Sequence, residues 1–313
     1  MFCRLAVACL LPAQMKDGSS CGRRDWEDLD RLWIAYRSPM KGAQTARAAE
    51  NARSNFRVGS ASHVRRILFF VLLLAAWEAF SRSGIREDYL FPGPSVVAQT
   101  LFDGIVRGDY LRGALVSMQR IAVGYGISMV LGVTLGALIA RNTILDDTVG
   151  ALVIGLQALP SVCWLPLAIL WLGLNESAIQ FVVVMGALFS IVLGVRDGIR
   201  NTPPIFVKAA RNLGARGVGL YVQVIVPAAL PSILAGLKQG WAFAWRSLMA
   251  AELLFFSLSL GNLLQTGRDF NDAAGVLAVM VLIITIGVAV NQLIFAPVER
   301  RIAERWGYAA AVQ

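Results

Sequence analysis

The amino-acid sequence predicts an all-α membrane protein with about six transmembrane helices. Hydrophobic residues make up 57% of the chain, and the mean hydropathy is +0.61. Only 16% of the residues are charged, whereas soluble domains average about 25%. The apolar residues also gather in segments of the ~20 residues that a helix needs to cross a bilayer. A soluble fold of this size would need a more highly charged surface, so we expect the helices to contact a lipid bilayer.

Six apolar segments follow one another along the chain, separated by polar residues, glycines and prolines. The third segment contains Pro160 and Pro166, which predict a break in its helix. The expected spans are 65–82, 114–140, 149–173, 177–196, 229–255 and 273–297.

The segment 83–113, between the first two spans, has a helical pattern of its own. Pro92, Gly93 and Pro94 predict a turn. Apolar residues then recur at helical spacing, at Val96, Val97, Leu101, Ile105 and Val106. We expect a short amphipathic helix that lies at the outer surface of the membrane.

The first 63 residues differ in composition from the rest of the chain. Residues 1–63 are polar and lack a long apolar run, which predicts a poorly structured N-terminal tail. Two interpretations of its beginning stay open. Either the apolar stretch 5–13 belongs to a signal peptide, or residues 1–39 are upstream sequence that precedes a later start such as Met40. The transmembrane domain is expected over 64–310.

Lys and Arg residues are unevenly distributed between the two sets of flanking segments. The tail, 141–148, 197–228 and 298–313 are richer in them than 83–113 and 256–272. Cytoplasmic flanks carry this excess, so we expect a multi-pass protein of the plasma membrane with both termini in the cytoplasm. The net charge of +9 is explained by these flanks, and no nucleic-acid partner is expected.

Residues for enzyme chemistry are scarce. His63 is the one histidine, and the four cysteines form no CxxC pair, so the sequence predicts no metal site. Neither a nucleophile with a general base nor a GxxxxGK[ST] phosphate-binding loop is present. Cys163 lies in an apolar run and is interpreted as a small buried hydrophobic residue. An enzyme is therefore not expected, and this chain is expected to bind no cofactor.

The segment 197–228 predicts a short helix with defined ends. Thr202 is expected to cap its N-terminus, with Pro203 in the first turn. Gly214 is placed to end it in a left-handed conformation. Phe206, Ala210 and Leu213 fall at i, i+4 and i+7 and predict one apolar face. A helix this short is marginal alone, so we expect it to pack against the membrane domain or a partner protein.

The same segment resembles the cytoplasmic signature of permease subunits of binding-protein-dependent ABC importers. That signature reads Glu-Ala-Ala, three residues, Gly, nine residues, Ile, one residue, Leu-Pro. Here Lys208, Ala209 and Ala210 are followed by Gly214 and, after the same intervals, by the stretch that ends at Pro227. The spacing matches throughout, but a lysine stands where the family has glutamate. The stretches 91–97, 117–126, 159–177 and 237–253 also look like the nitrate, sulfonate and taurine branch of these permeases.

The resemblance covers about residues 64–310, and it implies a function and partners. The 197–228 segment would form a coupling helix that sits in a groove of a separate ABC ATPase subunit, where ATP is bound. The permease would be a homodimer in a bacterial inner membrane and would receive a small oxyanion, sulfonate-like or nitrate-like, from an extracytoplasmic substrate-binding protein. Two alternatives from other classes stay open: an ATP-independent carrier or channel, and an integral membrane enzyme.

Polar and aromatic residues within the spans suggest a translocation path. Charges inside a membrane are costly and usually face a pore or a partner. Two cations beside aromatic rings suit a small anion, and the candidates are Gln157, Trp164, Lys238, Trp241, Trp245 and Arg246. As alternatives, Arg246 pairs with an acidic residue of a neighbouring helix, Lys238 reaches the membrane surface, and Gln157 hydrogen-bonds a neighbouring helix. Glu252 is interpreted as an interfacial residue at the outer end of the fifth span.

Two GxxxG spacings predict close contacts between helices. Gly132 and Gly136 lie in the second span, and Gly236 and Gly240 lie in the fifth. Small residues at this spacing let two helix backbones approach each other within a membrane.

Overall fold

The computed structural model describes residues 64–83 and 90–305, and every regular element within these ranges is helical. The all-α class is therefore confirmed. The chain divides into two compact units, Met1–Leu73 and Leu74–Gln313. The predicted tail over 1–63 lies outside the described residues. A helix covers 64–82, and the remaining elements all belong to the second unit.

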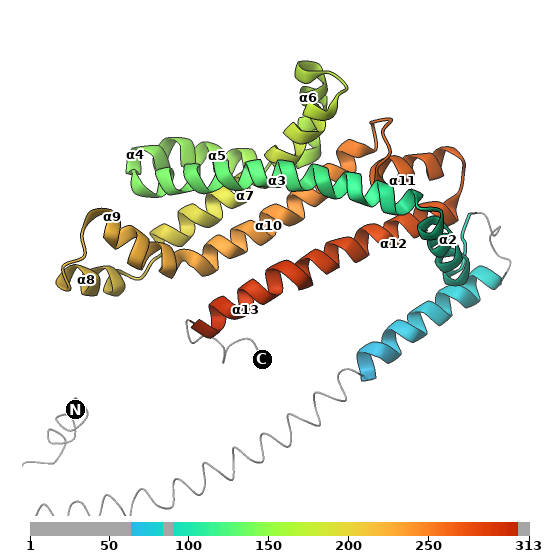
Figure 1. Cartoon of the computed structure of the whole chain (residues 1–313), viewed down its shortest axis with the longest axis horizontal. Coiled ribbons are helices and arrows are strands. Elements are labelled where there is room, and N and C mark those ends of the chain that lie inside the picture. Colours follow the sequence, from blue (N-terminus) through green and yellow to red (C-terminus); the bar gives the residue numbers. More distant parts are fainter. Residues whose placement is uncertain (1–63, 84–89, 306–313) are drawn as a thin grey trace, which may run out of the picture. The chain divides into compact units, whose positions relative to one another are not determined.

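Helices of very different length make up the second unit (Figure 1). In chain order they are α2 (Pro94–Arg107), α3 (Asp109–Arg141), α4 (Thr143–Leu145), η1 (Asp146–Gly150), α5 (Ala151–Gln157), η2 (Ser161–Cys163), α6 (Trp164–Leu172), α7 (Glu176–Arg200), α8 (Pro204–Asn212), α9 (Gly217–Leu220), η3 (Tyr221–Ile225), α10 (Val226–Glu252), α11 (Leu260–Asp269), α12 (Ala273–Val290), η4 (Asn291–Phe295) and α13 (Ala296–Arg305).

Among the described residues, four uninterrupted helices are long and apolar enough to cross a membrane: Asp109–Arg141, Glu176–Arg200, Gly217–Glu252 and Ala273–Glu304. A fifth crossing is added if the pair Thr143–Gln157 and Ser161–Leu172, bent by 95°, counts as one span. The helix over 64–82 is not among them, and it carries Arg65, Arg66, Glu78 and Arg82. Four of the six predicted spans are thus matched, the third is matched if the bent pair counts as one span, and the first stays a prediction.

Helix α7 is the centre of the fold, because it packs along both α3 and α10. Glycines make these approaches possible. A Cβ on Gly136 of α3 would lie 2.6 Å from the carbonyl oxygen of Val192, and a Cβ on Gly194 of α7 would lie 2.5 Å from the Cα of Gly236. Gly132 and Gly240 are equally close to α7. Both predicted GxxxG contacts are therefore confirmed, and each joins its helix to α7.

Two of the long helices contain a π-helical turn. The fifth predicted span, 229–255, lies within a longer element, because one continuous helix runs from Gly217 to Glu252. The π turn η3 (Tyr221–Ile225) precedes Pro227. Proline lacks an amide hydrogen and crowds the carbonyl of the preceding turn, and a π turn relieves such crowding without ending the helix. A second π turn, η4, joins α12 to α13.

The third predicted span is broken as expected. Its two helical parts are separated around Pro160, which has an extended conformation, and their axes differ by 95°. The break leaves Cys163, in the short turn η2, exposed. The interpretation of Cys163 as a buried residue is wrong, because the chain turns away from the helix bundle at this point.

The predicted amphipathic helix between the first two spans is confirmed as α2. Its first residue is Pro94, and Gly108 follows its last turn with a φ of +88°. The Glu78 carboxylate accepts hydrogen bonds from the Ser95 backbone N–H at 3.2 Å and from the Ser95 hydroxyl at 2.9 Å. This contact satisfies a free N–H in the first turn of α2.

Substitution Gly194→Ala tests the packing of α7 against α10. The added methyl group overlaps the Gly236 backbone, so we expect the free energy of unfolding to fall by about 1–3 kcal/mol. Gly126→Ala on α3 is the matched control, because its Cβ meets nothing within 4 Å, and there alanine favours the helix by up to about 1 kcal/mol. Denaturant unfolding in mixed micelles measures both, and equal effects would contradict the assignment of this contact.

Candidate functional sites

Helix α8 is a separate short helix with a regular C-terminal cap. It runs from Pro204 to Asn212, and Gly214 follows with a φ of +89°. The N–H groups of Gly214 and Ala215 donate to the carbonyls of Arg211 and Ala210 at 3.0 and 2.9 Å. This pair of hydrogen bonds is the Schellman motif, in which a left-handed glycine closes a helix. The prediction for Gly214 is confirmed.

The prediction for the N-terminus of α8 is wrong. Pro203 precedes the helix with an extended conformation, and no side chain caps it. The Thr202 hydroxyl instead donates to the carbonyl of Gly198 at 3.1 Å, in the last turn of α7. Because Pro204 at the first helical position has no N–H, one fewer donor needs a cap. Thr202 therefore ends α7 rather than starting α8.

The apolar surface of α8 is divided between a buried side and an exposed side. Ala210 is 8% exposed and packs with Leu220 and Ile225. Phe206 and Leu213, predicted on the same face as Ala210, are 45% and 89% exposed. The predicted apolar face is therefore only partly packed against the bundle, and Phe206 and Leu213 are available to the partner protein that the sequence also allowed. Large apolar side chains that are exposed in this way are typical of a surface that binds a partner.

The signature residues occupy different positions around this helix. Lys208 and Ala209 are exposed, Ala210 is buried against the bundle, and Gly214 forms the turn. Pro227 lies further along, inside the continuous helix that follows. Helices α8 and α9 lie at one end of the α7–α10 pair, and α11 lies at the other (Figure 1).

A cluster of charges anchors the end of α7 from which α8 departs. The Asp146 carboxylate is buried and pairs with both Arg196 and Arg200. Arg196 also contacts Asp197 at 3.1 Å. These pairs join the C-terminal turns of α7 to the π turn η1. The end of α7 from which α8 continues is therefore held in place. Sequence reasoning missed Asp146, although Asp146 and Asp147 stand out in a short segment between two predicted spans.

A cavity of about 310 Å³ lies where α5, η2, α7 and α10 meet. It brings together three of the predicted path residues, Gln157, Trp164 and Arg246. Most of the rest of its wall is apolar or aromatic, including Phe189 and Phe243, and two serines also line it. The predicted set is therefore divided, because Lys238, Trp241 and Trp245 line a neighbouring groove of about 410 Å³ that Arg246 also reaches.

Two buried polar groups that line the 310 Å³ cavity have hydrogen-bonding capacity available to a ligand. The Gln157 Oε1 and Ser190 Oγ atoms are buried and have no hydrogen-bond partner among the described residues. Buried polar groups normally find a partner. The Arg246 Nε–H donates to the carbonyl of Ala242 at 3.1 Å, and its guanidinium lies 4.8 Å from the centre of the Phe243 ring. Sequence reasoning missed Ser190, which is one of many serines in apolar segments.

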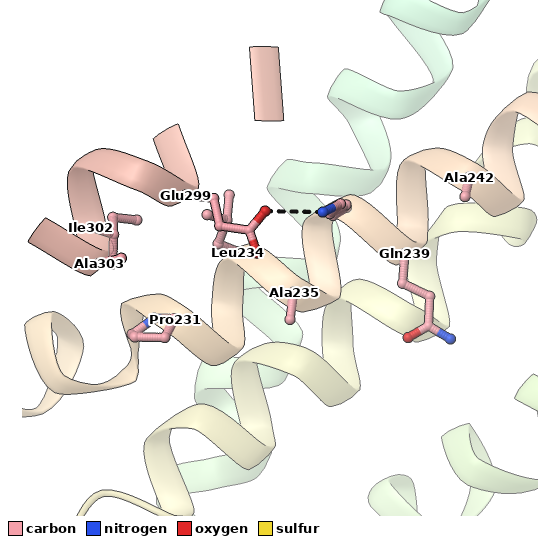
Figure 2. Close-up of a pocket in the computed structure, with 9 residues that line it drawn as sticks. Pro231, Leu234, Ala235, Gln239, Ala242, Glu299, Ile302 and Ala303 are labelled. Atoms are coloured by element: carbon pink, nitrogen blue, oxygen red, sulfur yellow. Dashed lines mark hydrogen bonds and ion pairs between the residues drawn. The ribbon is translucent and has the colours of Figure 1, made fainter. Parts of the chain in front are cut away.

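Lys238 has an acidic partner. Its Nζ lies 3.0 Å from Glu299 Oε2, which joins α10 to α13. Figure 2 shows this ion pair beside the apolar side chains of a pocket of about 550 Å³, with Pro231 and Leu234 on one wall and Ile302 on another. Pairing with an acidic residue of a neighbouring helix was considered for Arg246, but the structure shows it for Lys238.

The end of the bundle opposite α8 contains a buried ion network that the sequence did not reveal. Glu252 is fully buried, so its interpretation as an interfacial residue is wrong. Its carboxylate accepts from Arg120 at 3.0 Å, from the Ser117 hydroxyl at 2.7 Å and from the Gly261 N–H at 3.1 Å. Arg120 also makes two hydrogen bonds to Glu176, at 2.6 and 2.8 Å. The network joins α3, α7, α10 and α11.

Substitution Glu252→Ala tests this network. The change leaves Arg120 without its buried counter-ion, so we expect a loss of about 3–5 kcal/mol in the free energy of unfolding. Glu299→Ala is the control, because it breaks the more exposed pair with Lys238, where about 0–1 kcal/mol is expected. Thermal unfolding in detergent ranks the two, and a Glu252 variant as stable as the control would contradict the structural role.

The fold and these sites define a helical membrane protein with an exposed amphipathic helix at one end. Residues 130–304 match the family model described as binding-protein-dependent transport system inner membrane component. The chain belongs to this family. It is an integral inner-membrane protein and, as the membrane subunit of a transporter, not an enzyme.

Curated relatives are similar over nearly their full length. An ABC transporter permease of Methanocaldococcus jannaschii is 28% identical over 241 residues, which are 75% of this chain and 90% of that protein. A protein of Escherichia coli named as an aliphatic sulfonates transport permease is 29% identical over 238 residues, or 75% and 88%. The bicarbonate transport system permease of Synechococcus elongatus is 25% identical over 267 residues, or 79% and 95%.

Solved structures of ABC transporters share the fold. A methionine ABC transporter in an inward-facing conformation matches with a TM-score of 0.54 and 20% identity, over 61% of this chain and 95% of that one. An amino acid ABC transporter matches with a TM-score of 0.55 and 16% identity, over 64% and 97%.

Proposed function

We propose that this chain is the permease subunit of an ABC importer and forms the path for a small oxyanion. The observation that carries the proposal is that two features occur together in this chain. One is the exposed apolar side of α8, which has the signature spacing. The other is the cavity that contains Arg246. The first provides a place for an ATPase to act, and the second provides a place for an anion.

Helix α8 is the coupling helix of this proposal and docks in a groove of a separate ATPase subunit. Ala209 is small and exposed, so a partner can approach the helix backbone closely there. Ala210 holds the opposite side against the bundle. ATP-driven closure of two ATPase subunits moves α8, and α7 and α10 move with it because their packing is tight at Gly194 and Gly236. The cavity then opens alternately to the two sides of the membrane.

The assembly is a homodimer that receives substrate from an extracytoplasmic binding protein, as the family resemblance implies. The described part of one chain contributes four or five crossings, and a second copy completes the path. The binding protein selects the substrate, and the permease needs only moderate affinity for it.

The substrate class follows from the cavity wall. Arg246 supplies a positive charge, and hydrogen bonds between an ionised pair are stronger than neutral ones. Ser190 donates a hydroxyl hydrogen, and aromatic rings offer contact to a short organic group. An alkanesulfonate such as taurine fits this combination best. The relative named for sulfonates supports it, and nitrate and bicarbonate, the latter named for another relative, are the smaller alternatives.

Substitution Ala209→Trp tests the coupling assignment. A large side chain on the exposed side of α8 prevents close docking, so we expect substrate-stimulated ATP hydrolysis in proteoliposomes with the cognate ATPase to fall at least about tenfold. The control is Leu115→Trp, at a position of α3 that is 65% exposed. If the Ala209 variant kept full stimulation, α8 would not be the coupling helix. Uptake without any ATPase would instead indicate an ATP-independent carrier.

Substitution Arg246→Gln tests the anion path. Loss of a charge-assisted hydrogen bond, worth about 1.5–3 kcal/mol, corresponds to a roughly tenfold to hundredfold loss of binding. We expect uptake of radiolabelled taurine to fall accordingly. Lys238→Gln is the matched control, because Lys238 already pairs with Glu299, and we expect a change of less than about twofold there. Competition by nitrate and bicarbonate ranks the substrates, and equal losses in both variants would contradict the assignment.

A further inference from the structure

The segment around α8 is exclusively basic. No aspartate or glutamate occurs between Asp197 and Glu252, whereas Arg200, Lys208, Arg211 and Arg216 all fall in the first part of this interval. Lys208, Arg211 and Arg216 are exposed. Among the side chains that the structure describes, these three form no ion pair, whereas Arg200 is bound to Asp146.

Lys208 projects away from the helix bundle. Successive residues of an α-helix are about 100° apart, so Lys208 points roughly 160° away from Ala210, which is buried against the bundle. By the same geometry the exposed Ile205 lies about 60° from Lys208, and the exposed Ala209 lies about 100° from both Lys208 and Ala210. A partner that docks over Ile205 and Ala209 therefore also covers the ammonium group of Lys208.

Covering an unpaired ammonium group is costly unless the partner supplies an opposite charge. We propose that the groove which receives α8 carries acidic side chains opposite Lys208. This inference rests on the proposed function, in which the partner is the ATPase subunit. Permeases with glutamate at this position present a negative charge to their ATPase, whereas Lys208 presents a positive one. The charge pair proposed here therefore has the opposite arrangement. The charge of Lys208 thus makes this permease specific for its own ATPase and excludes ATPases whose groove is basic.

The neighbouring cations allow a different interpretation. Arg211 and Arg216 border a pocket of about 450 Å³ with Tyr221, and the Arg141 guanidinium lies 5.6 Å from the centre of the Tyr221 ring. An anionic lipid headgroup is the natural ligand for cations near a membrane. Lys208 does not line that pocket, and its outward direction favours a protein groove. The experiment separates the two ligands by the composition of the bilayer.

The test measures the affinity between the full-length permease in nanodiscs and its cognate ATPase. In zwitterionic phosphatidylcholine, we expect Lys208→Gln to weaken binding about tenfold and Lys208→Glu to weaken it more, because like charges then meet. We expect Lys208→Arg to restore tight binding. The loss caused by Lys208→Glu should diminish at high salt, and a Lys replacing one acidic residue of the ATPase groove should reverse it. Arg112→Glu, at an exposed position of α3, is the control and should bind as the unchanged protein does.

Three results would overturn the inference. The first is a Lys208→Glu variant that binds as tightly as the unchanged protein while Ala209→Trp abolishes binding, which leaves the proposed function intact. The second is an effect of Lys208→Glu that requires anionic lipid, because the partner of the lysine is then a headgroup. The third is unchanged binding in the Ala209→Trp variant, because the proposed function itself then fails.

Discussion

The packing of α7 between α3 and α10 is the constraint on which the rest of the structure depends. Between lipid-exposed helices there is no hydrophobic driving force for association, so close contact has to come from small residues. The contact of Gly194 with Gly236 fixes α7 against α10, and Gly136 fixes it against α3. Ser190 of the cavity lies one turn before Gly194, and α8 begins a few residues after α7 ends. Both candidate sites are thus positioned by the same helix.

Charges stabilise the two ends of this packed unit in different ways. At the end near α8, Asp146 pairs with Arg196 and Arg200, which are partly exposed. At the other end, Glu252 and Arg120 are buried together. A buried pair adds little net stability compared with apolar residues, but its geometry is demanding. We therefore infer that the buried pair fixes the orientation of the α10–α11 connection against α3. The Asp146 cluster fixes the position of the turn that precedes α8.

The sequence predicted features that depend on local chemistry and missed those that depend on how helices are rotated against one another. The left-handed Gly214 and the α8 helix were predictable, because each requires only its neighbours along the chain. The sequence also placed Gln157 and Arg246 in one candidate set, and both line one cavity. Polar and charged groups are costly in contact with lipid, so they tend to face the same interior cavity. The burial of Glu252 and the exposure of Cys163 were missed. Both depend on which side of a helix or turn meets the bundle, and hydrophobic spacing alone leaves that open when lipid replaces water outside.

The π turn η3 has a mechanical consequence. Because it lets the chain pass Pro227 without a break, one helix of about 36 residues runs from the α8 connection past Arg246, a length of about 54 Å at 1.5 Å per residue. No break interrupts this helix between the docking end and the cavity, and both the π turn and Pro231 lie along that stretch. A tilt of the whole helix by about 5° displaces its far end by roughly 5 Å over that length, nearly the diameter of a small anion. The helix acts as a lever that converts small angular changes into displacements as large as its cargo.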